Sequence, residues 1–209
     1  MTFGDKKEQK IIGFSLVENG ADSIKNAHAC IEKIDELVEG VDHTLKDAVI
    51  FLNHGIEILL KVMLEERNSV LLFKNIEKYQ KAKIIMKKEN KKDIFAADPE
   101  LQTVTLKESL DRLEYICDVE INSKMKNAIL ELNKTRNRLM HSKLSLYEQE
   151  FYKQIDVLKL CYNAVCDFFN KHIKSFNIYM TEARFEFTKE EEREFYEAWS
   201  EAEKLPVFD

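Results

Sequence analysis

Glycine and proline are scarce in this chain. Its 209 residues include only five glycines and two prolines, Pro99 and Pro206. Folds in which strands alternate with tight turns need these residues often, so their scarcity argues against doubly wound α/β folds and β-sandwiches. A chain of this length can still bury one sizeable core. We therefore predict an all-α fold, an up-and-down bundle of four to six helices with a C-terminal helical extension.

Long hydrophobic runs are also missing. The longest uninterrupted apolar segment, residues 48–52, is far shorter than the roughly 18 residues of a membrane span. The first residues, Met-Thr-Phe-Gly-Asp-Lys-Lys, contain no apolar signal-peptide segment, and the four cysteines show no disulfide-framework spacing. We expect a cytoplasmic protein with reduced thiols and no membrane partner.

The motifs of several enzyme classes are absent. The chain has no G-x-x-x-x-G-K-[ST] or G-x-G-x-x-G loop to cradle phosphates, and no G-x-S-x-G nucleophile elbow. None of the five histidines forms H-E-x-x-H or follows a glutamate by three residues, as a di-iron bundle requires. We therefore expect neither a metal nor a cofactor.

Apolar residues at helical spacing indicate the order of the helices. They predict helices over 22–39 and 43–67, the second capped by Asp42, and further helices over 124–141, capped by Ser123, and 147–177. A polar stripe on the second helix comprises Asn53, Glu57 and Lys61. Capping boxes begin a short helix at Thr105-x-x-Glu108 and a terminal helix at Thr188-x-x-Glu191.

Charge divides the chain into regions. Residues 74–92 contain eight lysines against two glutamates, and residues 121–143 contain six basic residues against one acid. Residues 182–204 contain nine glutamates against four basic residues, and 184–187 are expected to be briefly extended. We predict a helical domain over 15–178 and an acidic C-terminal extension over 179–209.

The helix predicted over 124–141 carries an unusual arginine. Its apolar residues Met125, Ile129, Leu132 and Leu139 form one stripe, and the position that completes the stripe is Arg136. A buried guanidinium is costly unless it is paired, so this position calls for a partner. Asn133, Asn137 and His141 recur every four residues beside it and therefore share a face.

These residues carry a resemblance to a known family. Residues 136–141, Arg-Asn-Arg-Leu-Met-His, resemble the Arg-x-x-x-x-His motif of the HEPN superfamily (higher eukaryotes and prokaryotes nucleotide-binding), in which a polar residue follows the arginine. Residues 54–61, His-Gly-Ile-Glu-Ile-Leu-Leu-Lys, and Asp111-Arg112-Leu113 agree with the family's surroundings of the motif. The resemblance covers about residues 15–178 and leaves the acidic extension unexplained.

The resemblance implies a metal-independent endoribonuclease of toxin or phage-defence type. It implies RNA as the substrate, a homodimer in which two motifs meet, and an antitoxin or regulatory protein as a further partner. Arg136, Asn137 and His141 would be the catalytic residues, leaving 2′,3′-cyclic phosphate and 5′-hydroxyl ends. An imidazole titrates near neutrality and so suits proton transfer, and a planar guanidinium suits a phosphate.

Further residues are candidates for contacts with RNA or for support. Basic side chains that could touch phosphates are Arg138, Lys143, Lys87 and Lys88, and supporting candidates are Glu57 and Asn133. Two alternatives stay open. One is a non-catalytic HEPN-like module that binds a nucleotide or a protein. The other is a helical interaction or immunity protein in which Arg136 forms a structural ion pair, with Glu57 as one partner considered.

Overall fold

The computed structural model describes residues 13–143, 145–182 and 188–202. Within these ranges the chain forms nine α-helices, one short 3-10 helix and no β-strand, which confirms the predicted all-α fold. In chain order the elements are α1 (Leu16–Glu36), α2 (Val41–Arg67), η1 (Ser69–Leu72), α3 (Ile76–Lys88), α4 (Ile94–Ala97), α5 (Leu106–Tyr115), α6 (Ser123–His141), α7 (Glu148–His172), α8 (Phe176–Thr181) and α9 (Lys189–Ala202). No helix in the described part is long and apolar enough to cross a membrane.

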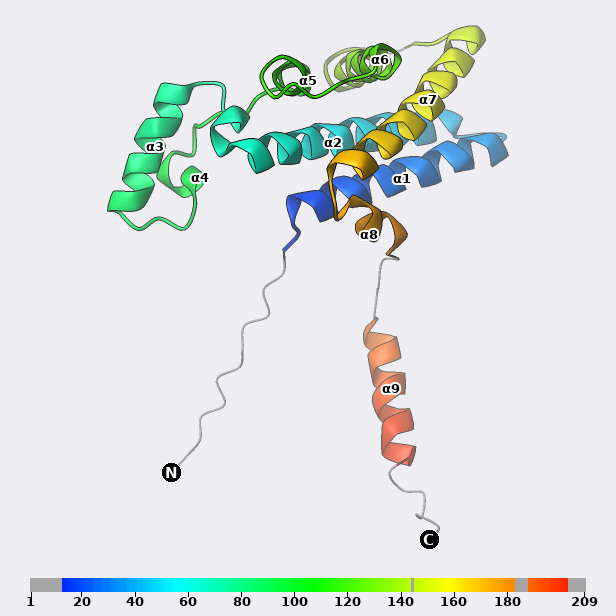
Figure 1. Cartoon of the computed structure of the whole chain (residues 1–209). Helices are drawn as coiled ribbons and strands as arrows, with labels where there is room; N and C mark the ends of the chain where they lie inside the picture. The colour runs from blue at the N-terminus through cyan, green and yellow to red at the C-terminus, as the bar shows by residue number, and fades with distance from the viewer. Residues whose placement is uncertain (1–12, 144, 183–187, 203–209) are drawn as a thin grey trace.

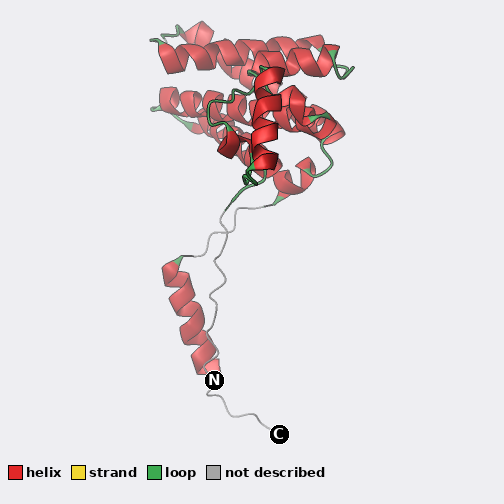
Figure 2. Cartoon of the chain, turned by 90° about the vertical axis from the view of Figure 1, so that its left-hand side faces the viewer, coloured by secondary structure: helices red, strands yellow, loops and turns green. Residues whose placement is uncertain are grey.

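The long helix α2 is the centre of the bundle (Figure 1). It pairs along its length with α1, while α5, α6 and α7 pack against its other sides and α8 packs on α1. Helices α3 and α4 pack together beyond the C-terminal end of α2 and form an arm. Helix α9 stands apart from the bundle in both views (Figures 1 and 2).

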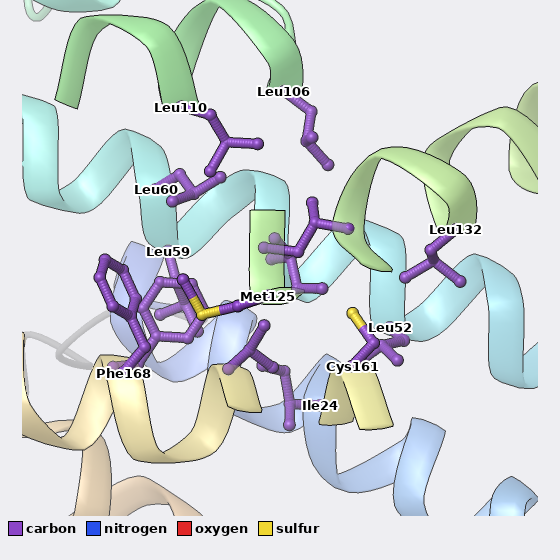
Figure 3. Packing of buried hydrophobic residues seen from close by; sticks show 14 of the residues in the cluster. Ile24, Leu52, Leu59, Leu60, Leu106, Leu110, Met125, Leu132, Cys161 and Phe168 are labelled. Carbon is purple, nitrogen blue, oxygen red and sulfur yellow. The ribbon is translucent and has the colours of Figure 1, made fainter. Parts of the chain in front are cut away.

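The core lies between α2 and the helices around it. Figure 3 shows buried side chains converging there from helices around α2, among them Ile24 of α1, Leu59 of α2 and Leu110 of α5. Each of these three side chains is fully buried, which stabilises the fold by about 1.5 to 3 kcal/mol per side chain before entropy is counted. The apolar stripe predicted on 124–141 supplies Met125 and Leu132 to the same core.

The predicted helix ends need several corrections. Helix α1 begins earlier than predicted because Ser15 and Glu18 form a capping box. Asp42 lies in the first turn of α2, and Gly40 holds the N-cap position with φ 75°, a left-handed conformation that glycine adopts without strain. Asn122, not Ser123, caps α6.

Other predicted boundaries also change. The helix predicted over 147–177 ends at His172, and α8 follows after a turn. The capping boxes at Thr105 and Thr188 are confirmed, whereas the expected extended segment 184–187 lies outside the described residues. Because α8 packs on α1, the helical body continues to Thr181, beyond the boundary predicted at 178.

The polar stripe predicted on α2 is only partly exposed. Asn53 is 1% exposed, and its Oδ1 atom accepts no hydrogen bond from the described residues. Lys61 and Glu57 form an ion pair of 2.7 Å at the partly buried end of the stripe. The sequence pattern groups Asn53 with the polar residues of α2. Because other helices pack around α2, Asn53 is nevertheless buried.

Two glycines let α1 and α2 approach closely. A Cβ atom on Gly55 would lie 2.8 Å from the carbonyl oxygen of Gly20 and 2.7 Å from Ile24 Cγ1. A Cβ atom on Gly20 would instead meet the side chain of Leu59 at 2.6 Å. The contact at Gly55 is with backbone, which can move only if the whole helix moves.

We predict that Gly55→Ala destabilises the protein by up to about 2 kcal/mol. Overpacking of about 1 to 3 kcal/mol should outweigh the gain of about 1 kcal/mol in helix propensity. Chemical denaturation measures the difference, with Gly13→Ala, where a Cβ atom meets nothing within 4 Å, as the control. Gly20→Ala should also destabilise the protein, because its Cβ atom would meet Cγ of the fully buried Leu59 at 2.6 Å. Equal stability of Gly55→Ala and the control would refute this close approach.

Candidate active site

Helix α6 carries the motif of residues 136–141 at its C-terminal end. The Asn122 side chain starts the helix by accepting the backbone N–H groups of Lys124 (2.8 Å) and Met125 (3.3 Å). Ser142 ends it, because both its backbone N–H (2.9 Å) and its hydroxyl (3.0 Å) donate to the carbonyl oxygen of Arg138. His141 is therefore the last helical residue, at the C-terminal end of α6.

A buried polar contact sets the rotation of α6 about its axis. The Thr135 hydroxyl donates to Gln154 Oε1 of α7 at 2.9 Å, and both side chains are buried. With Thr135 turned inward, Arg136 is half-buried and Asn137 and His141 are exposed. The expectation that Arg136 completes the buried stripe is therefore wrong, since Thr135 occupies the buried position in that turn.

A shallow groove lies along the exposed face of this helix end. Its volume is about 520 Å³, and its lining comprises Leu130, Asn133, Lys134, Asn137, Arg138, His141 and Ser142 with Lys107 of α5. The ionisable residues in this lining are two lysines, one arginine and one histidine, and no carboxylate accompanies them. We name it the α5–α6 groove. Such a lining attracts anions.

Ion pairs hold α5 beside α6. Lys126 of α6 bonds to Asp111 (3.0 Å) and Glu114 of α5, and the Lys126 ammonium also lies over the Tyr115 ring. The hydrogen bond with Glu114, followed by the one with Asp111, raises the pKa of Lys126 above its usual range despite its partial burial. The Lys126 ammonium therefore stays charged, and the two helices that line the groove stay together.

Arg136 lies next to the groove without lining it. Its Nη1 atom donates to Asn137 Oδ1 at 3.1 Å. Five residues of helix separate Arg136 from His141 by about 140°, so the two side chains leave the helix in different directions. The structure thus brings Asn137 and His141 together in one groove and places Arg136 beside Asn137.

The other predicted site residues divide between two regions. Asn133 and Arg138 line the α5–α6 groove, and Lys143 is exposed just beyond α6. Lys87 and Lys88 are exposed in the last turn of α3, on the arm (Figure 1). Glu57 pairs with Lys61 and not with Arg136, so the ion pair considered between Arg136 and Glu57 is not formed.

Sequence reasoning missed the two lysines of the groove, Lys107 and Lys134. Lys134 belongs to the basic region of 121–143 and lies one turn before Arg138, but the sequence did not distinguish it from the other basic residues of that region. Lys107 follows the capping box of a different helix, and only the packing of α5 against α6 brings it to the groove. Its approach to His141 has no signal in the local sequence.

The described residues offer neither a metal cluster nor an activated thiol. No group of three His, Cys, Asp or Glu side chains in these ranges could hold a metal ion. All four cysteines are free thiols. Burial raises the pKa of each, to about 12 for Cys161 and about 11 for Cys166, so none is a thiolate near neutral pH.

The comparisons with known proteins are negative throughout. No protein-family model, curated protein or solved structure matches this chain. The features that bear on its function are therefore its own residues, above all the motif 136–141 and the α5–α6 groove.

We predict that Thr135→Val destabilises the protein by about 1 to 3 kcal/mol. The Gln154 side chain would then be buried with neither its Oε1 nor its Nε2 atom bonded, since Nε2 already has no hydrogen-bond partner among the described residues. The double variant Thr135→Val with Gln154→Leu should recover most of the loss, because no polar group remains unpaired. Thermal and chemical unfolding measure both variants. A Thr135→Val protein as stable as wild type would show that this contact does not hold α6.

Proposed function

We propose that this protein is a metal-independent endoribonuclease of the HEPN type that acts as a homodimer in a toxin or phage-defence setting. The observation that carries the proposal is the α5–α6 groove, in which exposed His141 and Asn137 lie among three cationic side chains with no carboxylate. A phosphodiester backbone is the polyanion that such a groove suits. A regulatory or antitoxin protein would act by covering this same surface.

The chemistry assigns one task to each motif residue. The ribose 2′-oxygen attacks phosphorus and loses its proton, the P–O5′ bond breaks, and the departing 5′-oxygen takes up a proton. His141 would transfer a proton in this sequence, and Arg136 would stabilise the charge that develops on the phosphorane oxygens. Asn137, which accepts the hydrogen bond of Arg136, would orient that guanidinium. The products are a 2′,3′-cyclic phosphate and a 5′-hydroxyl.

A second copy of the chain would complete the site. Since Arg136 and His141 diverge around the helix, one motif surrounds a phosphate poorly, and a facing motif would supply the missing side. Met140, beside His141, is 51% exposed, and Tyr147 in the following turn is 84% exposed. Exposed apolar side chains next to a polar site are typical of a surface that a partner covers.

We predict that His141→Ala and Arg136→Ala each lower the rate of RNA cleavage by about 100-fold or more, the range of a lost proton-transfer or charge-stabilising group. Cleavage should persist in EDTA, and end analysis of the products should find cyclic phosphate and 5′-hydroxyl groups. His43→Ala and Arg193→Ala are matched controls on exposed positions outside the groove. Wild-type cleavage rates in both motif variants would refute the proposal.

The same assay separates the enzyme from a binding module. The groove alone offers enough cations to hold a phosphate, which favours a non-catalytic module as the second candidate. Purified wild-type protein that binds RNA but leaves total RNA intact, under conditions in which it is folded and dimeric, would select that candidate.

We predict that Lys107→Gln and Lys134→Gln each weaken RNA binding and lower the slope of log affinity against log salt by about 1, the value for one phosphate contact. Fluorescence anisotropy with 2′-O-methyl RNA, which cannot be cleaved through its 2′-oxygen, measures the slope. Lys33→Gln, at an exposed position of α1 outside the groove, is the control and should leave it unchanged. Lys88→Gln tests the basic arm separately. A smaller slope for Lys88→Gln with no change for Lys107→Gln would place the RNA path on α3 instead.

A further inference from the structure

A second cavity lies between α2 and the arm formed by α3 and α4. Its volume is about 500 Å³, and it shares no lining residue with the α5–α6 groove. We name it the arm cavity. Its size is within the range of about 300 to 1,000 Å³ that is usual for small-molecule sites.

The arm is attached to the bundle at its base, which leaves this space open. A single antiparallel bridge joins Phe73 to Thr103, and Arg112 of α5 donates to the carbonyl oxygens of Leu71 (2.7 Å) and Phe73 (3.0 Å). Beyond this base, Ala82 is the one buried residue of α3. The arm therefore does not close on α2 through a packed apolar interface.

Aromatic rings form part of the cavity wall. Phe73 stacks on Tyr79 with ring centroids 4.8 Å apart, and Phe95 of α4 tilts against Phe73 at 6.0 Å. The Tyr79 hydroxyl is paired with Ser69 at 2.9 Å, which holds that ring in place. Phe95 remains 46% exposed although it lines the cavity. Phe95 is therefore the exposed aromatic residue of the lining that a planar ligand would contact.

Two ammonium groups also line the cavity. Lys61 is held by Glu57 (2.7 Å) and Thr103 (3.1 Å), which use two of its three N–H donors. Lys83 of α3 has no hydrogen bond or ion pair with any described residue. An acid group on a ligand would give Lys83 the partner that the protein does not supply.

Two carboxylates in the cavity lining, Asp93 and Glu65, indicate which further group a ligand would carry. Asp93 is engaged, since its Oδ1 atom accepts the backbone N–H of Ala96 at 2.8 Å. Glu65 lines the cavity without a partner among the described residues. A ligand that met both Lys83 and Glu65 would carry a hydrogen-bond donor as well as an acid group.

We propose that the arm cavity binds a planar aromatic anion that also carries an N–H donor, with its rings on Phe95 and its acid group at Lys83. The proposal is independent of the ribonuclease assignment, because the cavity and the groove share no side chain.

The probe for the test is 8-anilinonaphthalene-1-sulfonate, which has fused rings, one sulfonate and one N–H group. Its fluorescence titration with the full-length protein should saturate at one probe per chain. Lys83→Gln should weaken binding about tenfold, the effect of one charge-assisted hydrogen bond, and Phe95→Ala about tenfold through lost ring contact. N-phenyl-1-naphthylamine, which lacks the sulfonate, should bind more weakly than the first probe and be insensitive to Lys83→Gln.

Two control variants on α3 show whether an effect on probe binding is specific to the cavity. Lys81→Gln and Ile76→Ala change exposed α3 residues outside the cavity lining and should bind like wild type. The sulfonate probe should also raise the Tm of wild type more than that of Lys83→Gln at the same concentration, which separates cavity binding from binding to unfolded chains. Unchanged affinity in both Lys83→Gln and Phe95→Ala would overturn the proposal. Displacement of the probe by decanoate, but not by naphthalene sulfonates, would overturn the aromatic ligand.

Discussion

The rotation of α6 about its axis is the constraint on which the candidate site depends. Thr135 is the one polar residue among the buried residues of α6. Its hydroxyl donates a hydrogen bond to Gln154 Oε1 of α7. A hydrogen bond between buried groups is specific in direction, so a rotated helix would leave both side chains unpaired. Apolar packing alone tolerates small rotations more readily. The exposure of Asn137 and His141 thus follows from a contact made on the far face of the helix.

The positive charge of the groove depends on how the charged residues of α5 are arranged around that helix. Two of the three carboxylates of α5, Asp111 and Glu114, bond to Lys126, and the third, Glu108, accepts the backbone N–H of Thr105, while Lys107 lines the groove. Attraction to a polyanion is strongest where cations are not neutralised by nearby acids. A chain whose net charge is −6 can therefore present a local cationic surface. The global charge is a poor guide to the partner, and the lining of the groove is a better one.

Much of the fold could be predicted from the sequence, because helical periodicity and capping boxes are local signals. The boxes at Thr105 and Thr188 mark helix starts correctly, and the scarcity of glycine and proline indicates an all-α chain. The burial of Asn53 and the half-exposure of Arg136 were not predictable, since both depend on which neighbours pack against a helix. A threonine is compatible with either face of a helix, so the pattern could not distinguish Thr135 from Arg136 as the buried residue.

Helix α5 is short, yet neighbouring residues on it bond in opposite directions. Asp111 is bonded to α6, and Arg112 is bonded to the two carbonyl oxygens at the base of the arm. Helix α5 is therefore attached to α6 through Asp111 and to the base of the arm through Arg112. Lys107 lies on the same ten-residue helix, so the helix that fixes the base of the arm also supplies a cation to the α5–α6 groove.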